Sequence, residues 1–365
     1  MEVQQALDVT NHTITLYPSN WLYNAGVIGL LRILEELGDR VEEFIADDGT
    51  TKISTTKNVD EIFENWDKLS PKSKKNNSLV YGWKDAYYAN QKEKSIKKRI
   101  SAFLQQKENG RKVKKTASTF SCIFCTKRVK IKKTDARFLN QAFGNILLGS
   151  EKSFSNMYWN HSAKDFVCSR CEYVLMCHHL GLTRLQDGSE IFINAPSFKL
   201  MFNLNRFARG IFGVSSLKEG RDKREILAMS VIEYATKIQT TLGIWTGMNI
   251  EIVSKRGDKI EFFNLPYEVI QLLVDRRIAS LLSQIGEFSI LNLVLNQDFT
   301  RLMELGYLLL RIGLKPENER GKSDRAFVAN YLKIKWNSKH TQHVAQLIFE
   351  LYAAIEEKTK KNIYL

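Results

Sequence analysis

The chain has 365 residues, of which 44% are hydrophobic and 26% are charged, a balance typical of a soluble globular protein with one or two domains. Its formal net charge of +14 is concentrated, because residues 71–133 carry 19 Lys and Arg against three acidic residues and the rest is nearly neutral. No segment is long and apolar enough to span a membrane and the first residues do not resemble a signal peptide, so we expect a cytosolic protein without a membrane partner.

The N-terminal segment predicts a strand followed by a central helix. Residues 12–17 alternate polar and apolar side chains, which indicates a short strand. Residues 21–37 are expected to form a helix that is capped by Ser19 or Asn20 and ended by Gly38. Apolar residues cover most of the circumference of this helix, so we expect it to lie in the core.

Two adjacent aspartates, Asp47 and Asp48, have two interpretations. Paired carboxylates suggest metal catalysis, whereas an Asp-Gly sequence at Gly49 is typical of a hairpin turn. The turn is the simpler explanation, and residues 41–54 therefore predict a hairpin. Residues 60–69 predict a short helix after it.

The basic segment, residues 71–133, contains a predicted amphipathic helix with Ile96, Ile100, Phe103 and Leu104 on one face. Concentrated positive charge is typical of proteins that bind nucleic-acid backbones, although a solvated lysine face or a disordered tail has the same composition. The internal position and aromatic content of the segment favour nucleic-acid binding. The candidate phosphate-binding residues are Lys94, Lys97, Lys98, Arg99, Lys112, Lys114, Lys115, Lys127, Arg128, Lys130, Lys132 and Lys133.

Two Cys-x-x-Cys pairs, Cys122/Cys125 and Cys168/Cys171, are the most specific motif in the chain. Together they can supply four thiolates to one structural zinc ion, whose closed coordination shell favours a scaffold over a catalyst. The pairs flank residues 126–167, a gap longer than a compact zinc ribbon has. Two local disulfides, a redox pair and an iron–sulfur cluster are the alternatives, and zinc is favoured because nothing marks a secreted protein.

The remaining elements alternate and then become entirely helical. Cys177 lies off the helical face of Cys171, so Cys177, His178 and His179 are interpreted as a buried thiol and two ordinary histidines. We expect a domain boundary near Pro266 and a bundle helix with an apolar stripe over 343–357. The other predicted elements are helices at 136–148, 168–179, 197–208 and 223–242, a strand at 190–194, and a hairpin at 249–263.

The predicted fold class is α+β. Residues 1–265 form a mixed N-terminal domain with the basic segment and a zinc-binding insert at about 116–180, and residues 266–365 form a C-terminal α-helical bundle. The sequence has no phosphate-binding loop, no dinucleotide fingerprint and no His-Glu-x-x-His motif, so it nominates no nucleophile or general base.

The run from Asn20 to Leu34, Asn-Trp-Leu-Tyr-Asn-Ala-Gly-Val-Ile-Gly-Leu-Leu-Arg-Ile-Leu, together with the two cysteine pairs, resembles the CXXC–CXXC CRISPR-associated proteins. These are the large subunit of type I-B Cascade complexes. The resemblance implies a non-catalytic subunit that helps recognise the protospacer-adjacent motif in target double-stranded DNA, stabilises the R-loop and helps recruit the helicase–nuclease. The implied partners are the CRISPR RNA, the target DNA, the other Cascade subunits and that helicase–nuclease.

Two other hypotheses fit the same residues. The chain could be a zinc-ribbon nuclease or an RNA-processing enzyme whose catalytic residues are dispersed in the sequence. It could also be a stand-alone zinc-containing DNA-binding regulator, although no recognition-helix motif is present.

Overall fold

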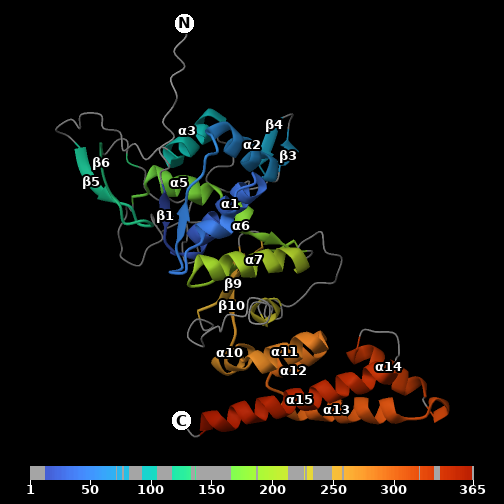
Figure 1. Ribbon diagram of the computed structural model, residues 1–365. Coiled ribbons are helices and arrows are strands. Elements are labelled where there is room, and N and C mark those ends of the chain that lie inside the picture. Colours follow the sequence, from blue (N-terminus) through green and yellow to red (C-terminus); the bar gives the residue numbers. More distant parts are fainter. Residues whose placement is uncertain are drawn as a thin grey trace. The chain divides into compact units, whose positions relative to one another are not determined.

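Helices and small sheets make up the protein, as the computed structural model in Figure 1 shows. The predicted combination of helices, sheets, a four-cysteine cluster and a helical C-terminal region is confirmed. The structure describes residues 13–70, 72–75, 78–81, 93–104, 117–132, 136, 166–185, 188–212, 226, 228–232, 249–256, 259–319, 321–332 and 338–363.

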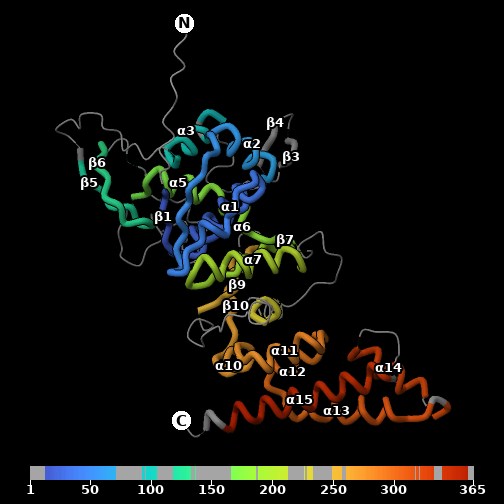
Figure 2. Tube along the Cα trace, viewed as in Figure 1, coloured from blue at the N-terminus to red at the C-terminus, as the bar shows by residue number. Residues whose placement is uncertain are grey.

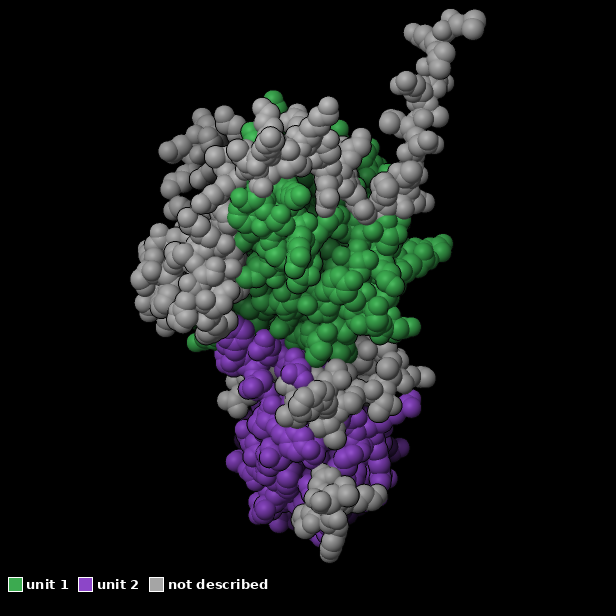
Figure 3. Space-filling view, turned by 90° about the vertical axis from the view of Figure 1, so that its left-hand side faces the viewer, with its two compact units in different colours: residues 1–205, 253–261 green, residues 206–252, 262–365 purple. Residues whose placement is uncertain are grey.

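Two compact units divide the chain. The first comprises residues 1–205 and 253–261, and the second comprises residues 206–252 and 262–365, coloured green and purple in Figure 3. The division is discontinuous in sequence, because residues 253–261 return to the first unit. The single boundary near Pro266 that the sequence suggests stays a prediction.

The central helix of the first unit is α1 (Trp21–Glu36), which confirms the predicted helix. Asn20 is its N-cap, and the Asn20 Oδ1 accepts a hydrogen bond of 3.0 Å from the backbone N–H of Tyr23. Gly38 follows the helix with a φ of +88°, a left-handed conformation that suits glycine. Thirteen residues of α1 are buried, in agreement with the apolar circumference of this helix.

Two glycines let α1 touch the backbone of the helices that follow the second cysteine pair, α5 (Ser169–Met176) and α6 (His178–Gly181). Figure 2 traces α1 beside α5 and α6, although they are far apart in the sequence. A Cβ atom on Gly26 would lie 2.2 Å from the Val174 carbonyl oxygen, and one on Gly29 would lie 2.0 Å from that of Cys177. No larger residue fits without moving a backbone, so these glycines fix how closely α5 approaches α1.

The expected hairpin over residues 41–54 is wrong in its first half. Residues Val41–Phe44 form a 3-10 helix, η1, while β2 (Thr51–Ile53) pairs antiparallel with β1 (Ile14–Leu16). The reason is burial, since β1 and β2 both turn their apolar residues to the core, whereas η1 begins with the buried Val41 and continues with two glutamates. The strand predicted at residues 12–17 is present over Ile14–Leu16.

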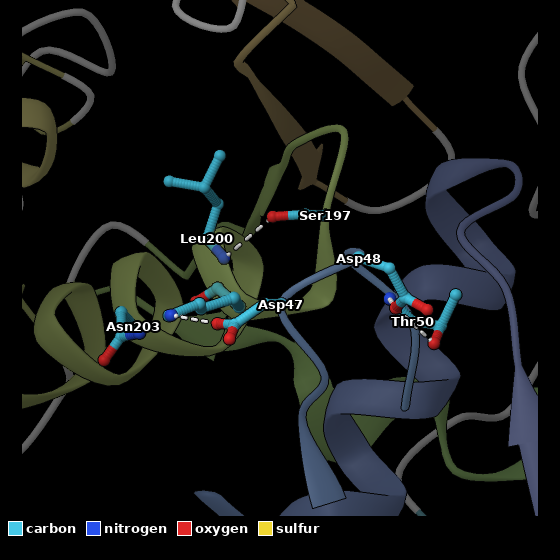
Figure 4. Close-up of polar contacts among 7 residues, drawn as sticks. Asp47, Asp48, Thr50, Ser197, Leu200 and Asn203 are labelled. Atoms are coloured by element: carbon cyan, nitrogen blue, oxygen red, sulfur yellow. Dashed lines mark hydrogen bonds and ion pairs between the residues drawn. The ribbon is translucent and has the colours of Figure 1, made fainter. Parts of the chain in front are cut away.

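The turn at the two aspartates is confirmed, and both carboxylates have structural partners (Figure 4). Asp48 accepts hydrogen bonds of 2.9 and 2.6 Å from the backbone N–H and the hydroxyl of Thr50. Asp47 lies 2.8 Å from the ammonium group of Lys199. Gly49 occupies the left-handed region with a φ of +85°. The pair therefore closes a turn, which explains it without a metal.

Further helices and small sheets make up the rest of the described chain before Pro266. The helix predicted at residues 60–69 and the strand predicted at 190–194 are confirmed, and the helix predicted from 197 continues to Phe212. One sheet has the strand order β10-β9-β8-β7. The elements are α2 (Val59–Leu69), β3 (Lys72–Lys75), β4 (Ser78–Tyr81), α3 (Glu93–Leu104), β5 (Ala117–Ser121), β6 (Arg128–Lys132), β7 (Thr183–Arg184), β8 (Glu190–Asn194), α7 (Phe198–Phe212), β9 (Glu251–Arg256) and β10 (Lys259–Asn264).

Two predicted helices fall largely outside the described residues. Of the helix at 136–148 only residue 136 is described, and of the helix at 223–242 residues 226 and 228–232 are described and helical. The two strands predicted around Gly257 are present as β9 and β10.

The chain after Pro266 is helical throughout its described part, as predicted. The apolar stripe expected over residues 343–357 is buried in the last helix at Val344, Leu347, Ile348, Leu351 and Ile355. No helix among the described ranges has the length and apolar character needed to cross a membrane. The elements are α10 (Tyr267–Leu273), α11 (Arg276–Ile285), α12 (Phe288–Leu295), α13 (Phe299–Leu314), η2 (Glu317–Glu319), α14 (Lys322–Tyr331) and α15 (Ser338–Ile363).

Candidate metal centre and basic surface

The four thiols of the two Cys-x-x-Cys pairs meet at one point. Their Sγ atoms all lie within 4.8 Å of one another, and Cys125 Sγ and Cys168 Sγ are 3.6 Å apart. Tetrahedral zinc with Zn–S bonds of about 2.3 Å holds its sulfurs roughly 3.8 Å apart. The arrangement therefore fits a four-thiolate metal site, and the long gap between the pairs does not prevent it.

The first pair sits in the loop of a β-hairpin. β5 and β6 pair antiparallel from Ala117–Lys132 to Ser121–Arg128, and the residues between the strands form the loop. Within the loop, Cys122 N–H donates to the Lys127 carbonyl at 2.9 Å, and Thr126 N–H donates to the Cys122 carbonyl at 2.8 Å. Thr126 has a φ of +55°, which turns the chain back towards β6. A metal bound here would join the two strands at their loop end.

The second pair opens α5. Cys168 is the N-cap of this helix and Cys171 stands in its first turn, a spacing that places both side chains on the same side. The backbone N–H of Cys168 donates to Cys122 Sγ at 3.4 Å, and Ile123 N–H donates to the Phe166 carbonyl at 3.0 Å. These contacts tie the hairpin loop to the start of α5.

The electrostatics of the cluster are compatible with a bound cation. Hydrogen bonds from Cys125 and the other thiols lower the pKa of Cys122, so this group ionises readily. Hydrogen bonds with Cys122 raise the pKa of Cys168 and of Cys171 in turn, with burial adding to the effect. Four thiolates at this distance repel one another, and a divalent cation is the group that stabilises all of them together.

A tyrosine from α1 lies against the cluster, and the motif search did not nominate it. The Tyr23 hydroxyl oxygen is 3.8 Å from Cys171 Sγ, and its ring stacks on Phe124 at 5.1 Å with an interplanar angle of 8°. Burial raises the pKa of Tyr23 well above its usual value, so the hydroxyl keeps its proton. The Cys171 thiol donates to the Tyr23 hydroxyl oxygen, and when Cys171 is a thiolate the hydroxyl can instead donate a hydrogen bond to the sulfur. The sequence signal is a tyrosine among the mostly apolar residues of the first half of α1.

The basic helix α3 has cations that are paired with carboxylates of the protein and cations that are exposed to solvent. Its apolar face is buried as predicted at Ile96, Ile100 and Phe103. Arg99 is also buried, 5% exposed, with its Nε 3.0 Å from Glu172 Oε1, which leaves it inaccessible to a phosphate group in this fold. Sequence reasoning missed this because the carboxylate belongs to α5, far away in the chain.

Lys97 is also engaged within the protein. Its ammonium group lies 2.7 Å from Asp60 and 2.6 Å from Glu93, and 4.9 Å from the centre of the Phe63 ring. The pKa of Lys97 is raised, first by the contact with Asp60. Lys94 and Lys98 are exposed on the same helix.

The remaining candidates divide by position. Lys127, Arg128, Lys130 and Lys132 are exposed on the hairpin beside the first cysteine pair. The others lie outside the described residues: Lys112, Lys114, Lys115 and Lys133.

The other potential ligands stand apart from the cluster. Cys177 is a fully buried thiol, and the group of four cysteines does not include it, His178 or His179. Burial lowers the pKa of His178 to about 4 and that of His179 to about 3, so both rings are neutral. His179 Nε2 lies 2.8 Å from the Ser70 hydroxyl, and His178 Nδ1 lies 2.6 Å from the Leu175 carbonyl. This arrangement agrees with the interpretation of Cys177 as a buried thiol and of His178 and His179 as ordinary histidines.

Comparison with known proteins bears on the same segment. Residues 115–183 match the family model described as CRISPR-associated protein (Cas_CXXC_CXXC). This match indicates a CRISPR-associated protein. It covers the hairpin, both cysteine pairs and the helices α5 and α6, so the matched segment is the one that brings the four thiols together. A search of curated proteins and a search of solved structures each found no match.

Proposed function

We propose that this chain is the non-catalytic large subunit of a type I-B CRISPR Cascade effector complex that acts in antiviral defence. The observation that carries the proposal is the coincidence of the family match over residues 115–183 with a closed set of four thiols. A site in which all four positions are protein sulfurs has no open position for a substrate, which is typical of a scaffold.

The proposed cofactor is zinc, held by Cys122, Cys125, Cys168 and Cys171. When bound, zinc would neutralise the thiolates and join the hairpin to α5. The chain's own residues support this role, because the backbone N–H of Cys168 and the Tyr23 hydroxyl both approach the sulfurs.

In the proposed complex, base pairing between CRISPR RNA and target DNA reads most of the sequence. The large subunit would contribute recognition of the protospacer-adjacent motif, stabilise the R-loop and help recruit the helicase–nuclease. Exposed cations beside the metal centre suit the phosphate contacts that these tasks need. The remaining partners would be the other Cascade subunits.

The decisive experiment is purification of the tagged chain from its native host, followed by sequencing of the nucleic acid that accompanies it. The expected result is repeat-flanked RNA of uniform length together with several other proteins. A chain that purifies alone, without RNA, and that hydrolyses nucleic acid with a divalent metal would contradict the proposal and support the nuclease hypothesis.

A further inference from the structure

The exposed surface of strand β6 is uniformly basic. Its burial alternates, so that Arg128, Lys130 and Lys132 are exposed while Val129 and Ile131 are partly buried. Side chains two residues apart share one face of a strand, and the three cations therefore form a row. We call this row, together with Thr119 on the neighbouring strand, the hairpin basic face.

The opposite face of the hairpin fixes which way the row points. Phe120 pairs with Val129 across the ladder and its ring lies 5.5 Å from that of Phe166. Phe166 lies two residues before Cys168 of the second cysteine pair, and its carbonyl accepts a hydrogen bond from the Ile123 N–H. An apolar contact on one side of the hairpin leaves the basic side to solvent. Figure 1 shows β5 and β6 as a ribbon that projects from the helices of the first unit.

The cations of the row differ from those of α3 in their partners. Lys97 and Arg99 are paired with carboxylates of α2, α3 and α5. Within the part of the chain that the structure describes, no carboxylate lies within ion-pair distance of Arg128, Lys130 or Lys132. Neither strand contains an acidic residue. The row therefore presents its charge to an external anion.

We propose that the hairpin basic face binds the sugar–phosphate backbone of a nucleic-acid strand without reading its bases. The assignment rests on the proposed function, which brings guide RNA and target DNA to this protein. The Arg128 guanidinium and the two ammonium groups would each donate to a phosphate, and the Thr119 hydroxyl, opposite Lys130 in the ladder, would add a neutral donor.

The spacing of the row suits a strand with regularly placed charges. Same-face residues of a β-strand are about 6.7 Å apart, so the three cations span about 13 Å. A nucleic-acid strand in a duplex carries one charge per roughly 3.4 Å of axis, so about four phosphates pass the row. Three cations would neutralise up to three of them, a contact that is electrostatic and independent of sequence.

The hairpin loop holds the row in place. Ser121 Oγ donates to the Thr126 carbonyl at 3.0 Å, and Cys122 N–H donates to the Lys127 carbonyl at 2.9 Å, directly beside Arg128. These bonds and the cysteine cluster order the loop end of the hairpin before any ligand arrives. A preordered row loses less conformational entropy on binding than lysines of a mobile loop would.

The test is a comparison of full-length chains that have the same net charge. One carries Arg128→Gln, Lys130→Gln and Lys132→Gln, and the matched control carries Lys52→Gln, Lys68→Gln and Lys322→Gln at exposed positions elsewhere. Affinity for short labelled single strands of DNA and RNA, each in two unrelated sequences, is measured from about 50 to 200 mM salt. Zinc content and thermal unfolding verify the fold of each variant.

The hairpin variant is expected to bind every strand about tenfold or more weakly, and its log–log salt slope should fall by about two, since each lost phosphate contact contributes roughly 0.7 on single strands. The control should keep the wild-type slope. If the triple variant does not fold, Lys130→Gln alone should lower the slope by about 0.7.

An unchanged slope in the hairpin variant, from a chain that still co-purifies with guide RNA, would overturn the hairpin assignment and leave the proposed function standing. Loss of a co-purifying protein with unchanged nucleic-acid affinity would assign the basic face to an acidic protein partner instead. A wild-type chain that binds no strand and co-purifies with no RNA would overturn both proposals.

Discussion

Tyr23 connects the N-terminal helix to the cysteine cluster through two separate contacts. Its ring stacks on Phe124, which lies inside the first cysteine pair, and its hydroxyl lies 3.8 Å from Cys171 of the second pair. The ring contact supports packing, whereas the hydroxyl contact acts on the charge of the sulfur. The two can be separated, because phenylalanine keeps the ring and removes only the hydroxyl.

We therefore expect Tyr23→Phe to fold and to bind zinc about tenfold more weakly, since outer-shell hydrogen bonds usually contribute one to two orders of magnitude of metal affinity. The measurement is transfer of zinc to a chromophoric chelator, supported by the absorption spectrum of the cobalt-substituted protein. Tyr173→Phe is the matched control, because Tyr173 is equally buried in α5 but its hydroxyl makes no hydrogen bond to the cluster within the described residues. Equal zinc retention in both variants would show that the Tyr23 hydroxyl does not act on the metal site.

His178 makes the first unit sensitive to acid. Burial lowers its pKa to about 4, whereas a histidine in the unfolded chain has a pKa of about 6.5. Between these values the unfolded chain binds a proton that the folded chain does not. The contribution of His178 to the free energy of unfolding is therefore constant above about pH 6.5. As the pH falls from about 6.5 towards 4, this contribution decreases by about 1.4 kcal/mol per pH unit.

The prediction is that His178→Asn flattens this dependence. Asparagine can still donate to the Leu175 carbonyl that His178 Nδ1 contacts, but it takes up no proton. The variant should be less stable than wild type near pH 7.5, because it loses buried ring contacts, and should lose less further stability between about pH 6.5 and pH 5. Urea unfolding at several pH values measures the difference. Protonation of the thiolates affects both proteins equally, so parallel curves would exclude His178 as the cause.

At the scale of elements, the helix pair α1 and α5 is held at backbone contact distance. Gly26 and Gly29 have no Cβ, and any added Cβ would overlap a carbonyl oxygen of the opposite segment. The close packing of α1 against α5 also places Tyr23 beside Cys171. The glycines of the N-terminal motif are therefore part of what positions the metal site.

Gly29→Ala should destabilise the protein by about 3 kcal/mol or more, since the new Cβ would lie 2.0 Å from the Cys177 carbonyl oxygen and only a backbone shift can relieve the overlap. Gly210→Ala is the control in another helix, because nothing lies within 4 Å of its added Cβ. There alanine should be neutral or stabilising by up to about 1 kcal/mol through its helix propensity. Chemical denaturation compares the two. A Gly29→Ala protein as stable as the control would contradict the close-packing argument.

Elements with strong local signals were predictable. Asn20 and Gly38 delimit α1 as expected, and the apolar run of β8 forms the predicted strand. Local patterns failed where a distant partner decides the outcome. The first strand of the hairpin predicted over residues 41–54 is instead the 3-10 helix η1, because β2 pairs with β1.

The same limit applies to the candidate site. The spacing of the two Cys-x-x-Cys pairs predicted that the four cysteines belong together, because two such pairs can supply four thiolates to one metal. Spacing does not show which lysine or arginine has an internal carboxylate, so Arg99 was predicted to bind phosphate although it is buried and paired with Glu172. It also gave no sign that Tyr23 would reach Cys171, since that contact depends on the packing of α1 against α5.

At the scale of the whole molecule, all five cysteines belong to the first unit, and the second unit is built mainly of helices. Around the cluster, α5 carries Cys171, then Glu172 and Tyr173, which contact Arg99 and Phe103 of α3. A metal held by the four thiols would therefore contact the hairpin through its loop and act on α3 through α5. In the second unit, α13 packs on α15 by apolar side chains such as Leu309 and Ile348.

Removal of the metal should consequently loosen one unit and spare the other. We expect a strong chelator to increase amide hydrogen exchange in β5, β6, α5 and α3, because the free energy of metal binding contributes to the folding of the elements it joins. Exchange in α13 and α15 should stay unchanged, because their protection comes from packing that contains no thiol. Hydrogen exchange read by mass spectrometry on the intact chain resolves both regions in one experiment. Equal loss of protection in α15 would mean that the units fold as one cooperative body, and unchanged protection in α5 would mean that the four thiols do not hold a structural metal.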